Sequence, residues 1–343
     1  MRIAEVSPIW ESTPPTGYGA VELITSLLSD GLVERGHDVS LFASGDSVTK
    51  AHLCPVVPKS LSASVVSEPE ACRLYQYTLV KRQSESFDII HSHLHSNSGL
   101  LGLLALDNIK VPVVHTLHLF LNPANFKLLE QYRDDAFVAI SRRHAELFSF
   151  LNIIGVVPLG IDSSAFPLCL EPAKEEYCAF MGRIRPEKGL EIAVQSALGS
   201  GMLLKIAGRI KPQDQVYFDE IVRPHLGNGI EFVGELSRCQ IAAFLGGASV
   251  VVCPTVIEEP FGLVAIEAMM CGTPVVALRL GAYPENIIDG LTGYLCDTHS
   301  FSEAIINAKS LSRIECGAHA RRNFDHYVMV ERYIEIFKSI IGK

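Results

Sequence analysis

Residues 250–278 read VVVCPTVIEEPFGLVAIEAMMCGTPVVAL, in which two short apolar runs flank a longer helical pattern. The first four and the last four residues are typical of strands buried in a parallel sheet. Residues 263–271 contain no Gly or Pro, and Gly272 and Pro274 follow them as helix stop signals. The segment therefore predicts strand, loop, short helix and strand, which is the repeating unit of an α/β protein.

The same alternation runs along the rest of the chain. Runs rich in apolar and β-branched residues predict further strands at Ile3–Val6, Asp38–Ala43, Phe87–His91, Val111–His115, Phe137–Ile140, Cys178–Met181, Leu203–Ala207 and Glu231–Val233. In the first half, helical patterns fall between the strands at Gly19–Arg35, Glu68–Ser84, Ser98–Leu106, Pro123–Tyr132 and Ser141–Phe150. This alternation predicts parallel sheets with helices on both faces, and two such sheets fit 343 residues better than one.

A cluster of turn-forming residues marks the expected boundary between two domains. Four Pro and Gly residues fall within residues 157–174. We expect one Rossmann-like domain at residues 1–160 and a second at residues 161–325. Residues 327–341 carry apolar side chains at helical spacing, which predicts a packed final helix. We expect residues 326–343 to pack back toward the first domain.

The bulk composition argues against several classes of partner. The net charge is −9, with 12 Lys+Arg against 16 Asp+Glu in residues 1–160 and 17 against 22 in the remainder. Because neither half is basic, nucleic acid and strongly anionic membranes are not expected as partners. The nine cysteines include no C-x-x-C pair, which favours reduced thiols and a cytoplasmic location. No apolar run is long enough for a membrane span.

One carboxylate falls inside the helical pattern of residues 263–271. Leu263 and other apolar residues lie one turn away from Glu267, so its own face of the helix is apolar. A buried carboxylate without a partner is costly, and Glu267 therefore requires a cation or hydroxyl donors from a ligand. Phe261 and Gly262 leave free amides at the helix N-terminus, which favour an anion. With Glu259 in the preceding loop, these features predict a site for a phosphorylated sugar or a nucleotide.

A second loop of the same half carries two cations. FMGRIRPEKGLEIAV, residues 180–194, predicts a strand, a loop with Arg183 and Lys188, and a helix. At a sheet edge, Arg would offer a diphosphate a fork of donors and Lys a point charge. An exposed loop whose charges, including those of Arg185 and Glu187, face water is an equally good interpretation of this fragment alone.

In the first half, residues 11–23 (ESTPPTGYGAVEL) form a turn between the first strand and the first helix. Gly17 and Gly19 would let the backbone approach a phosphate closely. The turn lacks the G-x-G-x-x-G fingerprint because Glu22 stands at its third glycine position. An ordinary strand-to-helix turn is an equally good interpretation.

Histidines gather at the ends of two expected neighbouring strands, at His91, His93, His95, His115 and His118. The HSHLH segment could form a metal cluster, since alternate residues of a strand share a face. No carboxylate or cysteine with ligand spacing accompanies it, so polar residues lining a cleft are the favoured interpretation. We expect His118 to point into that cleft, with His93 on the acceptor side. A histidine that caps the core is the alternative for His118.

Together these motifs resemble those of the retaining glycosyltransferases of family 4, which have the GT-B fold. The family's signature of two glutamates eight positions apart, with F-G-L between them, is matched by Glu259, Phe261-Gly262-Leu263 and Glu267. Further family motifs are matched at residues 182–189 (G-R-x-x-x-E-K-G), 116–118 (T-x-H), 160–162 (G-I-D) and 289–293 (D-G-x-T-G). Several motifs in the right order over essentially the whole chain make the resemblance specific.

The resemblance implies two Rossmann-like domains whose parallel sheets face each other across a cleft. It implies retaining transfer of a hexose from a nucleotide-diphosphate sugar, with UDP-glucose or another UDP-sugar expected, to a hydroxyl acceptor. No cofactor or metal is expected, since no D-x-D motif occurs. The resemblance implies that the donor diphosphate contacts Arg183, Lys188, Gly19 and the turn Phe261-Gly262-Leu263. It implies that the ribose contacts Glu267 and that the transferred sugar contacts Glu259. His118 would contact the sugar or the acceptor.

The first-domain turn departs from the family pattern. The usual Gly-Gly pair is Gly19-Ala20 here, and an alanine would restrict φ and push the donor slightly away, which predicts reduced activity or a shifted loop. Tyr18 and Glu22 place the turn closest to bacterial members related to tetrahydrobiopterin glucosyltransferases. Two alternatives remain open: a nucleotide-sugar epimerase of the same fold, and a non-catalytic nucleotide-sugar-binding protein. The acceptor and the oligomeric state are not determined by the sequence.

Overall fold

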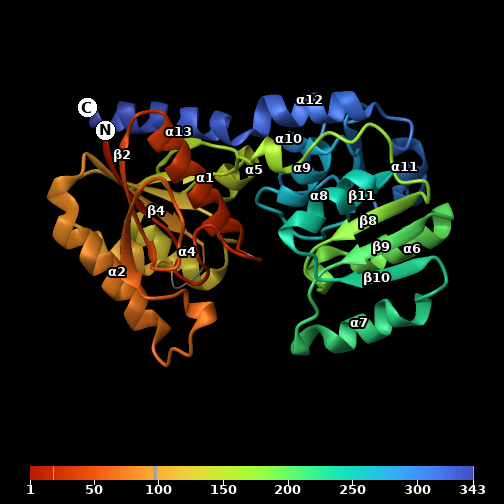
Figure 1. Ribbon diagram of the computed structural model, residues 1–343, viewed down its shortest axis with the longest axis horizontal. Coiled ribbons are helices and arrows are strands. Elements are labelled where there is room, and N and C mark those ends of the chain that lie inside the picture. The colour runs from red at the N-terminus through yellow and green to blue at the C-terminus, as the bar shows by residue number, and fades with distance from the viewer. Residues whose placement is uncertain (18, 96–98, 343) are drawn as a thin grey trace. The chain divides into compact units, whose positions relative to one another are not determined.

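Figure 1 shows the computed structural model of the chain, which describes residues 1–17, 19–95 and 99–342. The chain divides into two compact units, one of residues 1–160 with 326–343 and one of residues 161–325. Each unit contains one sheet, and every strand pair in both sheets is parallel. The expected α/β class with two parallel sheets is therefore confirmed.

The first unit has a seven-stranded sheet in the order β3-β2-β1-β4-β5-β6-β7. Its strands are β1 (Arg2–Val6), β2 (Asp38–Ser44), β3 (His52–Val57), β4 (Ile89–Leu94), β5 (Val113–Leu117), β6 (Ala136–Ala139) and β7 (Ile153–Val156). Its helices are α1 (Ala20–Glu34), α2 (Pro69–Gln83), α3 (Leu101–Ala105), α4 (Pro123–Leu129), α5 (Arg142–Leu147) and α13 (His326–Ile341). The strand order reverses between β1 and β4, the place where open parallel sheets bind ligands.

The second unit has a six-stranded sheet in the order β10-β9-β8-β11-β12-β13. Its strands are β8 (Tyr177–Met181), β9 (Leu203–Ala207), β10 (Ile230–Gly234), β11 (Val250–Cys253), β12 (Val275–Leu278) and β13 (Gly293–Cys296). Its helices are α6 (Leu190–Ser200), α7 (Gln215–Ile221), α8 (Arg238–Gly247), α9 (Leu263–Met270), α10 (Tyr283–Asn286), α11 (Phe301–Ala308) and α12 (Arg313–Phe324). Here the order reverses between β8 and β11, so the loops after these strands flank the reversal.

The last helix, α13, belongs to the first unit although it follows the second unit in the sequence (Figure 1). On its core-facing side, Tyr333 and Phe337 are fully buried. A Cβ added at Gly31 of α1 would lie 2.5 Å from Val330 of α13, so α1 and α13 approach too closely for any larger residue at position 31. The amphipathic helix expected over residues 327–341 is confirmed.

Three strands escaped the sequence analysis, and all three lie at sheet edges: β3, β7 and β13. An edge strand pairs on one side only, so its sequence need not be a continuous apolar run. Strand β3 carries Pro55 and several half-exposed residues, and β7 is half-buried along its whole length. The end of β4 was also placed wrongly, because the strand continues through His93 to Leu94 rather than ending at His91.

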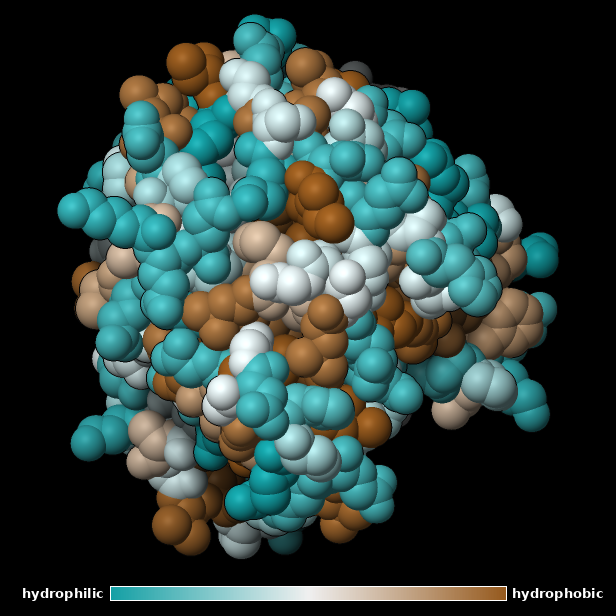
Figure 2. All heavy atoms as spheres, turned by 90° about the vertical axis from the view of Figure 1, so that its right-hand side faces the viewer, coloured by the Kyte–Doolittle hydropathy of each residue, from teal (hydrophilic) through white to brown (hydrophobic). Residues whose placement is uncertain are grey.

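Within the described residues, the structure has no helix that is long and apolar enough to cross a membrane. Figure 2 shows one face of the molecule in which hydrophilic side chains predominate and apolar ones are interspersed. This distribution is ordinary for a folded domain, whose surface always retains much apolar area.

Candidate functional site

The predicted donor loops lie next to each other at the carboxyl edge of the second sheet. The loop at residues 182–189 follows β8, the loop at residues 254–262 follows β11, and these two strands are paired. The amide of Val256 donates a hydrogen bond to the carbonyl of Glu187 at 3.0 Å. Gly189 has φ +69°, and a Cβ there would lie 1.9 Å from the carbonyl oxygen of Pro254. The two loops are therefore in direct backbone contact.

Helix α9 begins in this region with an uncapped N-terminus. Its N-cap residue Gly262 has φ 85°, and no side chain caps the helix. A Cβ at Gly262 would also lie 2.7 Å from the ring of Tyr283, so both backbone conformation and space require glycine. The first amides of the helix form a favourable environment for an anion.

Glu267 lies in α9 and is half-buried. In the part of the chain that the structure describes, its carboxylate forms no hydrogen bond and no ion pair. Burial raises the pKa of Glu267 to about 7, and the charge of Arg238 offsets only part of this effect. The structure thus agrees with the expectation that no protein partner neutralises this acid.

Lys188 and Glu259 form an ion pair that links the two loops. Both side chains are largely buried, at 17% and 15% exposure. Lys188 ends a short 3-10 turn, Pro186–Lys188, and Gly189 follows it as the N-cap of α6. The sequence placed both residues at a donor site but did not predict that they contact each other.

The other cations of this loop differ in their contacts. Arg183 is half-buried and has no hydrogen bond or ion pair to another residue within the described ranges. Arg185 lies 3.1 Å from the carboxylate of Glu187 and 3.7 Å from that of Asp214. Arg183 is therefore available to an added anion, whereas Arg185 is already neutralised.

The backbone of Glu259 is held by a segment that the sequence analysis did not connect to the site. The amide of Ala282 donates to the carbonyl of Glu259 at 3.0 Å. Gly281 has φ +59°, and a Cβ there would lie 2.4 Å from the amide nitrogen of Glu259. Two rigid contacts thus fix the position of Glu259, and the glycine at 281 was the available signal.

In the first unit, the histidines surround a buried glutamate. Glu5 of β1 is opposite His91 in the parallel register of β1 and β4. The Nδ1 atom of His91 lies 3.0 Å from the Glu5 carboxylate, and Nε2 of His93 lies 3.2 Å from it. The expectation that no carboxylate accompanies these histidines is therefore wrong. Glu5 is distant in sequence, and its signal was an acid inside the apolar run 3–6.

The cluster of Glu5, His91 and His93 is also the one group, among the residues that the structure describes, with a possible metal-ligand arrangement. One ligand atom of each residue lies within 4.8 Å of the others. All three side chains are at most 1% exposed, and their hydrogen bonds to one another satisfy the facing atoms. A carboxylate that accepts two N–H bonds accounts for the arrangement without an ion.

His118 and His95 are the two members of the histidine group that lie just past a strand end and are half-buried. His118 follows β5, and its Nε2 atom lies 3.0 Å from Nδ1 of His93. His93 itself lies within β4, is 1% exposed and, with His95, lines a small pocket, so its expected place on the acceptor side stays a prediction. His115 lies on the face of β5 opposite to that of Thr116, and its ring contacts Phe137.

Sequence comparison identifies the family. Residues 169–325 match Glycosyl transferases group 1, and residues 21–165 match Glycosyltransferase Family 4. The chain belongs to glycosyltransferase family 4. This family 4 enzyme is 29% identical over 344 residues to the D-inositol 3-phosphate glycosyltransferase of Mycolicibacterium smegmatis, covering 86% of this chain and 79% of the relative. The Mycobacterium tuberculosis (strain F11) protein of the same name is 28% identical, covering 84% and 70%.

Solved structures support the GT-B fold of this family 4 glycosyltransferase. Sucrose-phosphate synthase from Thermosynechococcus elongatus superposes with a TM-score of 0.81 at 20% identity, covering 100% of this chain and 99% of that one. A glycosyltransferase involved in avilamycin A biosynthesis gives a TM-score of 0.75 at 24% identity, covering 100% and 98%. The expected fold is confirmed.

The first-domain turn of this glycosyltransferase differs from expectation at Ala20. Gly19 is the N-cap of α1 with φ 156°, and Ala20 is the first residue of the helix. Among the described residues outside glycine, only Asn108 has a positive φ, so Ala20 carries no backbone strain. Only its methyl group distinguishes it from the usual glycine. Tyr18, which suggested the bacterial subgroup, lies outside the described residues.

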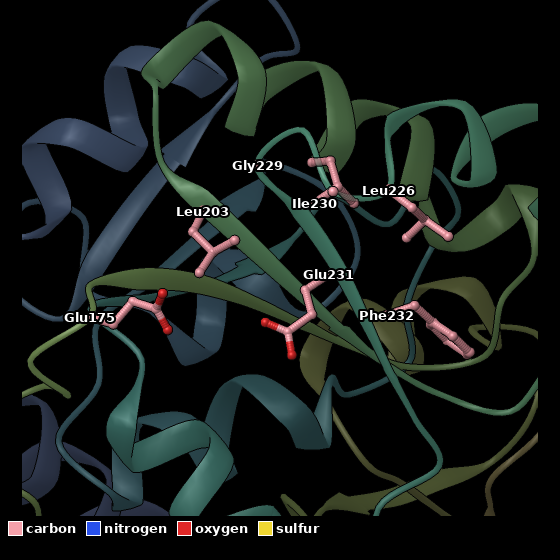
Figure 3. A pocket seen from close by; sticks show the side chains of 8 residues that line it. Glu175, Leu203, Leu226, Gly229, Ile230, Glu231 and Phe232 are labelled. Atoms are coloured by element: carbon pink, nitrogen blue, oxygen red, sulfur yellow. The ribbon is translucent and has the colours of Figure 1, made fainter.

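A cavity of about 390 Å³ lies in the second unit of the glycosyltransferase, at the opposite end of its sheet from the donor loops. Figure 3 shows Leu203, Ile230 and other lining residues near the starts of β9 and β10. Its carboxylates Glu175 and Glu231 lie 3.2 Å and 3.5 Å from the ammonium of Lys205. Because parallel sheets bind substrates at the carboxyl ends of strands, this cavity is not the candidate site.

Proposed function

We propose that this glycosyltransferase moves a hexose from a nucleotide-diphosphate sugar, with a UDP-hexose expected, to a hydroxyl group of a small acceptor. The transfer retains the anomeric configuration and needs no metal. The observation that carries the proposal is the unpaired, half-buried carboxylate of Glu267 on the helix whose N-terminus is uncapped. The N-terminus of this helix favours a bound anion, and the Glu267 carboxylate on its side favours hydroxyl groups that donate hydrogen bonds.

The donor would occupy the carboxyl edge of the second sheet. The ribose hydroxyls would donate hydrogen bonds to Glu267, which supplies the partner that this desolvated acid lacks. The diphosphate would lie against the first amides of α9, with Arg183 and Lys188 neutralising its charge. Arg183 suits this role because none of its described neighbours pairs with it.

Donor binding would exchange one ion pair for another. Without donor, Lys188 is paired with Glu259. A diphosphate carries more negative charge than one carboxylate, so it would draw Lys188 away and leave Glu259 free to accept hydrogen bonds from the transferred sugar. The pair thus keeps two largely buried charges neutralised until the donor arrives.

The chemistry would depend on electrostatic stabilisation of the leaving group. As the bond between the sugar and the diphosphate breaks, Arg183, Lys188 and the α9 amides would stabilise the developing negative charge. The sugar would become oxocarbenium-like, and the acceptor hydroxyl would attack from the face that the diphosphate leaves. Its proton would pass to an oxygen of the departing diphosphate. His118 would hydrogen-bond the sugar or the acceptor.

The relatives suggest a polyol as acceptor and a uridine nucleotide as donor product. Curated relatives are named D-inositol 3-phosphate glycosyltransferases, and one solved neighbour, from Anabaena, was crystallised with UDP and glucose. The chain is only 19% identical in sequence to the Anabaena structure. The proposed donor is therefore argued from the residues of the site and not from that similarity. All nine cysteines are free thiols, which favours the cytoplasm as the proposed location.

A thermal-shift panel of nucleotide sugars, followed by transfer assays with the stabilising donor, tests this proposal. A ligand that binds only the folded state raises Tm, and the expected panel result is a shift for one nucleotide-diphosphate sugar. The same donor should then be consumed only when a polyol acceptor is present. Conversion of the donor alone would indicate an epimerase, and a Tm shift without consumption by any acceptor would indicate a binding protein.

A further inference from the structure

A line of hydrogen bonds runs from the core of the first unit to His118. Glu5 is 0% exposed and lies 3.2 Å from Nε2 of His93. Nδ1 of His93 lies 3.0 Å from Nε2 of His118. His118 is half-buried, and its Nδ1 atom has no partner among residues 1–17, 19–95 and 99–342. The line thus begins at a buried acid and ends at one open nitrogen.

The chemistry of the partners fixes where the protons lie. Burial lowers the pKa of His93 to about 4, so its ring is neutral at pH 7 and carries a single N–H. An ionised Glu5 can only accept, which puts that N–H on Nε2 of His93. Nδ1 of His93 must then accept from Nε2–H of His118, and the open Nδ1 of His118 keeps its lone pair.

We propose that Glu5 and His93 are positioning residues that hold His118 in the tautomer whose Nδ1 is unprotonated, so that His118 accepts a hydrogen bond from a hydroxyl of the sugar or acceptor. This inference rests on the proposed function, in which His118 contacts substrate. Without the line, a neutral histidine at the sheet edge would exchange between tautomers and present an acceptor for only part of the time.

A second arm of the network also ends at the Glu5 carboxylate. Nδ1 of His91 lies 3.0 Å from Glu5, and its Nε2 lies 2.7 Å from Oγ1 of Thr116, which lies 2.8 Å from the Tyr333 hydroxyl. Burial lowers the pKa of His91 to about 3, so this ring is also a neutral donor to Glu5. Burial raises the pKa of Glu5, and the hydrogen bond and charge of His93 oppose that rise only in part. The two ring nitrogens that face the carboxylate are the geometry that favours its ionised form.

The two arms provide a matched pair of variants. Glu5→Gln keeps the shape of the side chain, but an amide cannot accept from both histidines without turning a donor toward one of them. The variant therefore allows His93 and His118 to reverse their protons. Tyr333→Phe removes a hydrogen bond from the other arm and leaves the atoms between Glu5 and His118 unchanged.

The test is ¹⁵N NMR of histidine-labelled protein at neutral pH, which reports the tautomer of each ring without any substrate. Wild type and Tyr333→Phe should show His118 with protonated Nε2, whereas Glu5→Gln should show a mixture or the reverse tautomer. In transfer assays Glu5→Gln should lower kcat about tenfold, the worth of one well-placed hydrogen bond, with the donor KM unchanged.

Three results would overturn the proposal. One is protonated Nδ1 at His118 in the wild type, which would mean that Glu5 is a neutral donor. Another is an equal loss of kcat in Tyr333→Phe, which would indicate general loosening of the core. The third is a stoichiometric metal ion in the purified protein, since it would replace the protons between Glu5 and the histidines. The NMR result stands even if no transfer is found, so it is separate from the proposed function.

Discussion

The ammonium of Lys188 contacts the carboxylate of Glu259, and this ion pair joins the loops that follow β8 and β11. The contact brings together two side chains that are 71 residues apart in the sequence. It also means that the unliganded protein already holds a cation next to the amides of α9. Any anionic ligand that enters must compete with Glu259 for it.

Lys188→Ala should abolish transfer while the fold stays intact. Loss of this cation removes charge stabilisation of the leaving diphosphate, so kcat/KM should fall by at least about 10²-fold. Steady-state kinetics and circular dichroism would measure the two effects. Lys205→Ala is the matched control, because Lys205 is also largely buried, at 20% exposure, and is ion-paired at the other end of the sheet. Near-normal turnover in Lys188→Ala would contradict the site.

Glu267 should make stability fall as pH rises. Its folded pKa is raised from 4.5 to about 7, so the folded state binds more protons than the unfolded state between these values. Stability is therefore lost as pH rises through this window, by about 1–2 kcal/mol for this half-buried group. Glu267→Gln should remove that loss, and denaturant unfolding at pH 5 and pH 8 would measure it. An equal pH dependence in the variant and the wild type would show that Glu267 is not the group concerned.

Glu267→Ala should also prevent donor binding. The ribose hydroxyls would lose their acceptor, and the Tm shift given by the nucleotide sugar should fall to a small fraction of its wild-type value. Because the wild-type acid has no described protein partner, the variant should be at least as stable as the wild type without ligand at pH 8. A full ligand-induced shift in Glu267→Ala would mean that the nucleotide binds elsewhere.

Gly262→Ala should weaken the start of α9. The positive φ and the 2.7 Å approach to the Tyr283 ring both oppose a Cβ at this position. We therefore expect a loss of about 1–3 kcal/mol in the free energy of unfolding and a higher KM for the donor. Gly201→Ala is the matched control, since Gly201 has φ +69° but no atom within 4 Å of an added Cβ. Urea unfolding of both variants separates the cost of the positive φ from the cost of the contact with Tyr283. Equal losses would show that the contact with Tyr283 contributes nothing.

A chelator should leave activity unchanged. The proposed charge stabilisation comes from Arg183, Lys188 and helix amides, which need no ion. Assays after extensive treatment with EDTA, with and without added Mn²⁺, would measure this. Strict dependence on Mn²⁺ would require a different arrangement around the diphosphate.

The local arrangement of the second-unit candidate residues could be predicted because they are adjacent in sequence, and their role as a site stays a prediction. Phe261, Gly262, Leu263 and Glu267 belong to one loop and one helix, so the pattern that forms the helix also places the residues. The contact of Lys188 with Glu259 and the support from Gly281 could not be predicted, since they depend on which strands become neighbours.

The contacts of the first-unit candidate residues were predicted less well because they too depend on which strands become neighbours. His91 and His93 were expected on one face, and both do contact Glu5. Their carboxylate partner comes from β1, which joins them only through the β1–β4 pairing. The edge strands β3 and β7 were missed because partly exposed strands lack the apolar runs that mark the sheet centre. Strand β13 was missed because it has only four residues and begins with a glycine, which is rare in strands.

Helix α13 follows the second unit in the sequence but completes the first unit. Its Tyr333 bonds to Thr116, and the rings of Tyr333 and Phe337 contact His91. On the ribosome, residues 1–160 therefore remain without part of their interior until residues 326–341 are translated. A truncation that removes α13 should disable the histidine network, although every proposed donor contact lies far upstream.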